Sequence, residues 1–193
     1  MDGLIAKKCR DGIGTYRADI LLSLERKIWI SGAIDEKCAF EVINQLLVLD
    51  CENDEEITLL ISSPGGSINE GLAIYDVMKT LQSPIRTVAI GTVASMASVL
   101  FSSGNKGKRE ILPSARIMIH DPRIMGEGGV MTARQVIELG NNLQVTKNVI
   151  NSILAKNCGK ELEKVNEDTL IDKYMTAEDA IEYGIADVIC ERL

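Results

Sequence analysis

The sequence predicts an α/β domain in which strands alternate with helices and pair largely in parallel. Short β-branched or aliphatic runs, such as 57–62 and 85–91, are separated by segments with apolar residues at helical spacing. A turn rich in proline and glycine, Ser63-Pro64-Gly65-Gly66-Ser67, directly follows one of these runs. Alternation of this kind is typical of a largely parallel sheet with helices packed on it.

The elements are expected in the following order. Strands are predicted at 24–31 around Ile28, Trp29 and Ile30, at 57–62 and 85–91, at 112–120, and at 185–190. Helices are predicted at 35–51, after Ser67, from Ser95 onward, and at about 132–157, because apolar residues recur there every three or four positions. Thr176, with Asp179 three residues on, predicts the start of a short helix that Gly184 ends. Residues 1–18 are expected to form a mobile arm, and 19–193 a single domain.

Composition excludes several classes of function. The chain has 193 residues, 46% hydrophobic but only 4% aromatic, and a net charge of −7. An acidic surface with few aromatic rings disfavours nucleic acid as a partner. The most apolar stretch, 93–101, is half a membrane span, so we expect a protein that is neither embedded in a membrane nor secreted. The five cysteines are scattered and form no C-x-x-C pair, which predicts reduced thiols, a cytoplasmic location, and neither a metal site nor a cofactor.

Ser95 is the first candidate for chemistry. It lies in Gly91-Thr92-Val93-Ala94-Ser95-Met96-Ala97, after a predicted strand and at the start of a predicted helix, with small neighbours that leave its hydroxyl accessible. A helix start supplies free N–H groups that suit an oxyanion beside a nucleophile. His120, the only histidine, follows 25 residues later at the end of a predicted strand. It is either an ordinary half-buried histidine or the base that takes the Ser95 proton.

The remaining partners are open at this level. The chain holds 28 acidic residues, so spacing alone chooses no orienting carboxylate for the histidine. Asp121 is a poor candidate, because successive strand residues point to opposite faces. Gly66 either serves an ordinary turn or offers its N–H to an oxyanion, with the N–H of Met96 as the second donor. Both positions would lie at the carboxyl ends of parallel strands, where open α/β sheets bind their ligands.

Five blocks of sequence together resemble one family. They are Ser63-Pro64-Gly65-Gly66-Ser67, Gly91 to Ala97, Lys106-Gly107-Lys108-Arg109, Leu112 to His120, and Thr176 to Gly184. In this order and spacing they resemble the proteolytic subunit of the Clp protease over residues 25–193. The resemblance implies a crotonase-like α/β spiral, with a protruding handle helix from about residue 132.

The resemblance implies the activity of an ATP-dependent Clp protease proteolytic subunit, a serine endopeptidase that is expected to cut unfolded polypeptides inside a ring-shaped chamber. It implies Ser95 as the nucleophile, His120 as the base and Asp172 as the residue that orients the histidine. Gly66 and Met96 become the oxyanion donors. Substrate-binding positions are Ser67, Ile68 and Pro122. The implied assembly is a homo-oligomer of heptameric rings that stack to a tetradecamer, served by an AAA+ unfoldase of the ClpX, ClpA or ClpC type.

Departures from the family pattern favour dependence on a partner. Leu170 and Ile171 stand where relatives carry an arginine that pairs between rings, and Thr58, Leu60 and Thr80 replace aromatic docking residues. An alternative is therefore a weakly active or regulatory subunit in heteromeric rings with a typical paralogue. A crotonase-type acyl-CoA enzyme is a more distant alternative, since that class needs no Ser/His/Asp set.

Overall fold

The structure, a computed structural model, describes residues 4–9, 12–123 and 130–193. The described chain begins with an antiparallel hairpin of β1 (Leu4–Cys9) and β2 (Gly12–Arg17), followed by the short helix α1 (Ala18–Ser23). The predicted arm at residues 1–18 therefore contains regular structure. Whether it moves as an arm, and whether the domain begins at residue 19, stay predictions.

A mainly parallel sheet forms the centre of the molecule. Its strands are β3 (Lys27–Ile34), β4 (Ile57–Gly66), β5 (Ile85–Ala94), β6 (Arg109–Ile111) and β9 (Val188–Ile189), in that spatial order. β7 (Arg116–Ile119) pairs in parallel with the last residues of β5, and β8 (Lys173–Met175) pairs antiparallel to β7. The predicted α/β class with largely parallel pairing is confirmed.

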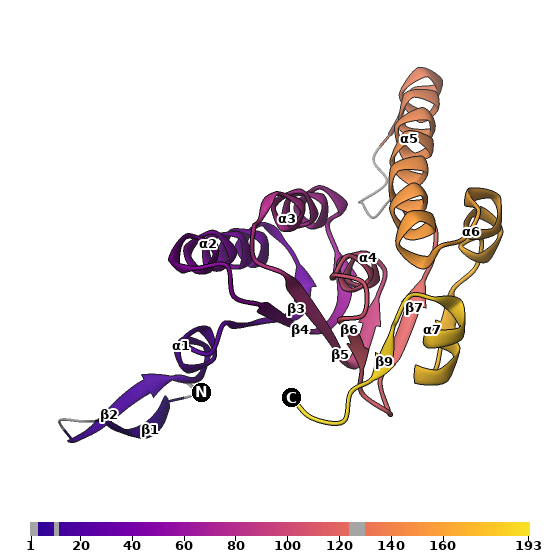
Figure 1. The fold of residues 1–193 in the computed structure, drawn as a ribbon. Coiled ribbons are helices and arrows are strands. Elements are labelled where there is room, and N and C mark those ends of the chain that lie inside the picture. The colour runs from indigo at the N-terminus through magenta and orange to yellow at the C-terminus, as the bar shows by residue number, and fades with distance from the viewer. Residues whose placement is uncertain (1–3, 10–11, 124–129) are drawn as a thin grey trace.

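Helices cover one face of this sheet. They are α2 (Glu36–Glu52), α3 (Ile68–Thr80) and α4 (Met96–Ser102), which lie side by side above the strands (Figure 1). Apolar side chains from both layers form the core, and Leu46, Leu59 and Phe101 are completely buried there. Aliphatic residues dominate the core, so the fold has a large buried interior although the chain has few aromatic residues.

The helix α5 (Ala133–Cys158) projects away from the body (Figure 1). Only its C-terminal part is buried against the core, at residues such as Ile150 and Leu154, whereas most of its N-terminal half is exposed. α6 (Leu162–Asp168) packs beside it, whereas α7 (Ala177–Tyr183) lies against β7, β8 and β9. The predicted long helix and the Thr176 cap are confirmed, and Thr176 and Asp179 form a reciprocal capping box.

Three sequence predictions of elements were wrong in detail. The run 112–120 is not one strand, because a turn in which the Ala115 N–H donates to the Leu112 carbonyl separates β6 from β7. β4 does not end at residue 62 but continues to Gly66, with a shift of register between Ile61 and Ser63 that accommodates the proline. The last strand, β9, has two residues only.

Within the described residues, no helix is long and apolar enough to cross a membrane.

Candidate active site

Ser95 occupies a strained turn between β5 and α4. Its backbone has φ 56° and ψ −127°, one of two positive φ values among the described residues other than glycine. Non-glycine residues in such regions cost about 1–3 kcal/mol and persist only where the surroundings impose them. Here the Ser95 N–H donates to the Met118 carbonyl of β7 at 2.9 Å, and the Ser98 hydroxyl donates to the Ser95 carbonyl at 2.6 Å. The turn therefore holds the Ser95 side chain at the carboxyl end of the sheet.

Glycine at the end of β4 permits the close approach of that strand to the Ser95 turn. A Cβ added to Gly65 would lie 2.7 Å from the Ser95 Cβ and 2.9 Å from the Met96 nitrogen, and its φ is +91°. No larger residue fits without moving the turn. Of the Gly65-Gly66 pair, only Gly66 was predicted from the sequence as a site residue. A Cβ at Gly66 would lie 2.4 Å from the Ile34 carbonyl oxygen, so a larger residue at Gly66 is expected to disturb β3 as well as any oxyanion site.

One small pocket brings several predicted residues together. Ser95, Met96 and His120 line it with Ile68 and Pro122, and buried apolar side chains of α5, Ile150 and Leu154, form its base. Met96 is the first residue of α4, where backbone N–H groups lack acceptors within the helix. The pocket therefore combines a hydroxyl, an imidazole and a helix start, and its walls are largely apolar. Gly66 and Ser67 follow at the nearby end of β4 and the start of α3, but they do not line the pocket.

Asp172 lies beside the histidine without a hydrogen bond to it. The His120 Nδ1 atom is 3.7 Å from the nearest carboxylate oxygen of Asp172, and it is buried without a hydrogen-bond partner among the described residues. The same carboxylate oxygen contacts the Arg123 guanidinium. Asp172 is thus close enough to orient His120 after a small movement, but in this conformation it is paired with Arg123.

The surroundings keep His120 in its neutral form. Burial lowers the pKa of His120, and the positive charge of Arg123 lowers it further, while the carboxylates of Asp172 and Asp121 oppose the shift. Neutral imidazole is the form that accepts a proton from a serine hydroxyl. At neutral pH the histidine is therefore ready to act as a base.

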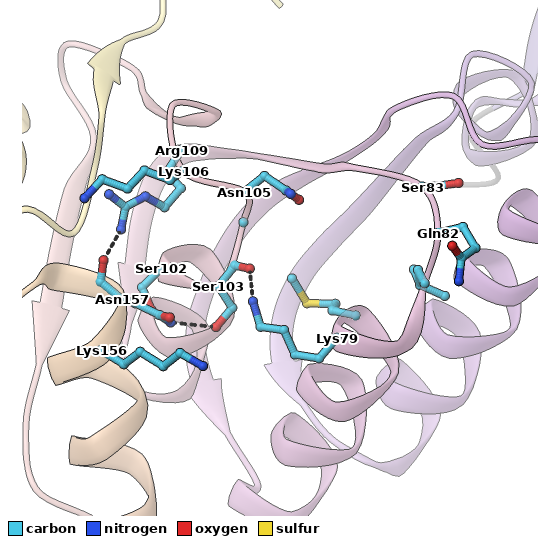
Figure 2. Close-up of a pocket in the computed structure, with 13 residues that line it drawn as sticks. Lys79, Gln82, Ser83, Ser102, Ser103, Asn105, Lys106, Arg109, Lys156 and Asn157 are labelled. Carbon is cyan, nitrogen blue, oxygen red and sulfur yellow. Dashed lines mark hydrogen bonds between the residues drawn. The ribbon is translucent and has the colours of Figure 1, made fainter.

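A second pocket has a different character (Figure 2). It lies between α3, α4 and the end of α5, and its lining includes Lys79, Lys106, Arg109 and Lys156 but no acidic residue or histidine. The Lys79 ammonium donates to the Ser103 carbonyl at 2.6 Å, and the Asn157 amide donates to the Ser103 hydroxyl at 3.1 Å. These contacts join α3 and α5 to the C-terminal end of α4. The lining of this pocket holds neither the histidine nor the carboxylate of a Ser/His/Asp triad.

A metal-binding cluster is absent from the part of the chain that the structure describes. Across the described residues, no group of three or more histidine, cysteine, aspartate or glutamate side chains is arranged to hold an ion. The first pocket has a hydroxyl and an imidazole in its lining, and the Asp172 carboxylate lies 3.7 Å from that imidazole. With the crotonase-like α/β fold, this set of groups defines the class as an α/β serine hydrolase.

The comparisons with known proteins give the family. The profile described as Clp protease matches residues 14–193. A protein of Ligilactobacillus salivarius (strain UCC118), named ATP-dependent Clp protease proteolytic subunit, is 43% identical over 186 residues, which cover 96% of this chain and 93% of the relative. The chain belongs to the Clp protease family, and as a member it is a serine endopeptidase. Members of this family are oligomeric proteolytic subunits that work with Clp ATPases.

Proposed function

We propose that Ser95, His120 and Asp172 form the catalytic triad of an ATP-dependent Clp protease proteolytic subunit. The observation that carries the proposal is the shared pocket, in which a serine on a strained strand-to-helix turn lies with the only histidine of the chain. His120 takes the proton of the Ser95 hydroxyl as that oxygen attacks the peptide carbonyl, and then gives it to the leaving amine. Water hydrolyses the resulting ester in the second half of the reaction.

The oxyanion of the tetrahedral intermediate is proposed to accept hydrogen bonds from the N–H groups of Met96 and Gly66. The position of Met96 at the start of α4 supports the first donor, because its N–H has no acceptor in the helix. The position of Gly66 at the end of β4 supports the second donor. Ser67, Ile68 and Pro122 are proposed to contact the substrate, and two of these, Ile68 and Pro122, line the pocket of Ser95.

The proposed active form is a ring assembly of copies of this chain, heptameric and stacked in pairs. Large apolar side chains exposed on α5 and next to Asp172 support a partner on this side of the molecule: Val136, Ile137, Val145, Leu170, Ile171 and Tyr174. On α2, Phe40 is 69% exposed and Val48 59%. Contiguous exposed apolar surface of this kind marks protein interfaces. An AAA+ unfoldase would feed unfolded polypeptide into the enclosed chamber, and we place the complex in the cytoplasm because the cysteines show no pairing pattern.

Covalent labelling tests the triad directly. A fluorophosphonate probe is expected to acylate the assembled protein at Ser95, as located by mass spectrometry of the labelled peptide. Prior incubation with a β-lactone should block the labelling, because both reagents compete for one activated hydroxyl. Modification at another serine, or none in assembled protein, would refute the assignment.

The departures at the ring interface lead to a second expectation. Leu170 and Ile171 are exposed apolar residues and do not provide the charged link between rings that an arginine gives to relatives. Loss of about 1 kcal/mol per subunit pair is multiplied around a ring and strongly shifts assembly. We expect the isolated chain to exist largely as single rings or smaller species with weak peptidase activity. A typical paralogue should drive it into double rings and raise labelling at Ser95.

Analytical ultracentrifugation with peptide hydrolysis on the same samples measures this expectation. A stable homomeric double ring with full activity and no paralogue would contradict it, and would show that Leu170 and Ile171 sustain the contact between rings by apolar packing instead. A mixed ring in which Ser95 stays unlabelled would favour the regulatory alternative for this subunit.

A further inference from the structure

Asp121, the residue directly after His120, has three strong contacts with segments far away in the sequence. One of its carboxylate oxygens forms an ion pair with the Lys147 ammonium of α5 at 2.7 Å. The other oxygen accepts a hydrogen bond from the Thr169 hydroxyl at 2.7 Å. Its backbone N–H donates to the Thr169 carbonyl, also at 2.7 Å. Asp121 therefore joins the end of β7 to α5 and to the segment that leads to Asp172.

The Thr169 end of this network is buried. Thr169 is 1% exposed, and its hydroxyl oxygen accepts a hydrogen bond from the amide of Asn151, which is fully buried on α5. The hydroxyl has a single proton, and a carboxylate at 2.7 Å is a better acceptor than the Val165 carbonyl at 2.9 Å. Thr169 precedes Asp172 by three residues, so whatever fixes Thr169 also limits where Asp172 lies.

The Lys147 end of the network is on the helix that protrudes. Lys147 and Asn151 are four residues apart, which places them on the same face of α5. The side chains of Lys147 and Asp121 are only 18% and 27% exposed, so their attraction is less screened by water than that of a surface pair. Lys147 lies at the boundary between the exposed N-terminal half of α5 and its buried C-terminal part.

We propose that Asp121 is a positioning residue that couples the handle helix α5 to the proposed catalytic residues His120 and Asp172. The inference rests on the proposed triad. A shift of α5, such as contact of its exposed half with another ring would cause, acts on Asp121 through Lys147. Asp121 passes it to His120 by the direct peptide bond and to Asp172 through Thr169. The 3.7 Å gap between His120 and Asp172 is the distance that such a shift has to close.

Opposite changes of charge at the two ends of the ion pair test this role. Asp121→Asn keeps an oxygen for the Thr169 hydroxyl and keeps the backbone N–H, but it loses the ion pair. Lys147→Met loses the ion pair and leaves the Asp121 carboxylate unneutralised. A misplacement of this size is expected to lower kcat/KM for peptide hydrolysis by about 10-fold or more in both variants. Lys147→Arg keeps the ion pair and should retain most of the activity.

The pH profile separates positioning from mere folding. The charged groups around His120 are Asp121 and Arg123 on its own segment, Asp172 before β8, and Lys147 on α5 behind Asp121. A carboxylate nearby raises the pKa of His120, so its removal in Asp121→Asn should move the acidic limb of kcat/KM to lower pH. Lys147→Met removes a positive charge and should move the same limb to higher pH. A purely structural defect does not predict that the acidic limbs of the two variants move in opposite directions.

The measurements use the full chain in its assembled form, with ring size checked by sedimentation on each sample. Asp76→Asn, a change at an exposed carboxylate of α3 with no ion pair in the described part of the chain, makes the same change of charge and should leave rate and limb unchanged. If Asp121→Asn fails to fold, the pair Lys147→Met and Lys147→Arg decides. A lower melting temperature with unmoved limbs, or limbs that move the same way, would overturn the positioning role. A missing label at Ser95 in the unmodified protein would instead remove the triad on which the role depends.

Discussion

Ser95→Ala is expected to abolish peptide hydrolysis and probe labelling, with a loss of about 10⁴- to 10⁶-fold in kcat. The reason is that, in the proposed triad, the acyl intermediate forms on the Ser95 hydroxyl. His120→Ala should cost nearly as much, because without the imidazole the hydroxyl keeps its proton. The double variant should be no worse than either single one, since residues of a triad act as a unit and their losses do not add.

Initial rates with a fluorogenic peptide, on rings of verified size, measure this loss. Ser114→Ala is a suitable control, because Ser114 is exposed in the turn between β6 and β7 and contributes nothing to the pocket. It should retain the unmodified rate. Hydrolysis that survives Ser95→Ala at more than about 1% of the original rate would point to another nucleophile.

Asp187→Asn is expected to be the most destabilising single change among those considered. The Arg109 guanidinium, 3% exposed, donates two hydrogen bonds to the Asp187 carboxylate, at 2.9 and 2.5 Å. The backbone N–H groups of Gly107 and Arg109 donate to the same carboxylate at 2.8 and 3.0 Å. An uncharged side chain leaves a buried cation without its counter-charge, which costs about 3–5 kcal/mol. For a chain of this size, the melting temperature should fall by about 6–20 °C.

Thermal unfolding as a function of pH is a second test of how much the Arg109–Asp187 ion pair stabilises the fold. Burial alone would raise the pKa of Asp187, but the hydrogen bonds from Arg109 hold that pKa below its ordinary value. A carboxyl with a depressed pKa in the folded state stabilises the fold above its unfolded pKa, and that stability is lost as the pH falls through the folded pKa. The difference in stability between unmodified protein and Asp187→Asn should therefore be full at neutral pH and shrink in acid.

An exposed pair of the same geometry provides the control. Arg17 also donates two hydrogen bonds to Asp19, but these side chains are 66% and 52% exposed. Asp19→Asn should cost less than about 1 kcal/mol. Equal losses at the two sites would mean that burial contributes nothing at Asp187.

Much of the fold could be predicted from periodicity, because local patterns report local structure. The long helix, the capping box at Thr176, and the strands β4 and β5 followed from the spacing of apolar and capping residues. In the run predicted as one strand at 112–120, only Arg116–Ile119 is a strand, because residues 112–115 form a turn that separates β7 from β6. The short helix α6 and strand β8 have too few residues to show a period.

The candidate site could be predicted only in part. Ser95 and His120 stood out through their flanking residues and the uniqueness of the histidine. Asp172 was chosen by resemblance, because nothing local distinguishes it from other carboxylates. Asp121 was set aside as the orienting carboxylate on the alternation of strand side chains, and its contacts with Lys147 and Thr169 join residues 26 and 48 positions away, which no local pattern reports. Arg123, which occupies Asp172 in this conformation, was not foreseen as part of the site.

The backbone of Ser95 sets folding against function. The positive φ of Ser95 destabilises the folded state by about 1–3 kcal/mol, and interactions elsewhere in the molecule offset this strain. Glycine would adopt the same turn at lower cost, and it would have no hydroxyl. The protein is therefore less stable than its own sequence with a single glycine at this position could be. Selection for stability alone would replace the proposed nucleophile, so selection for the proposed reaction is what would keep serine at this position.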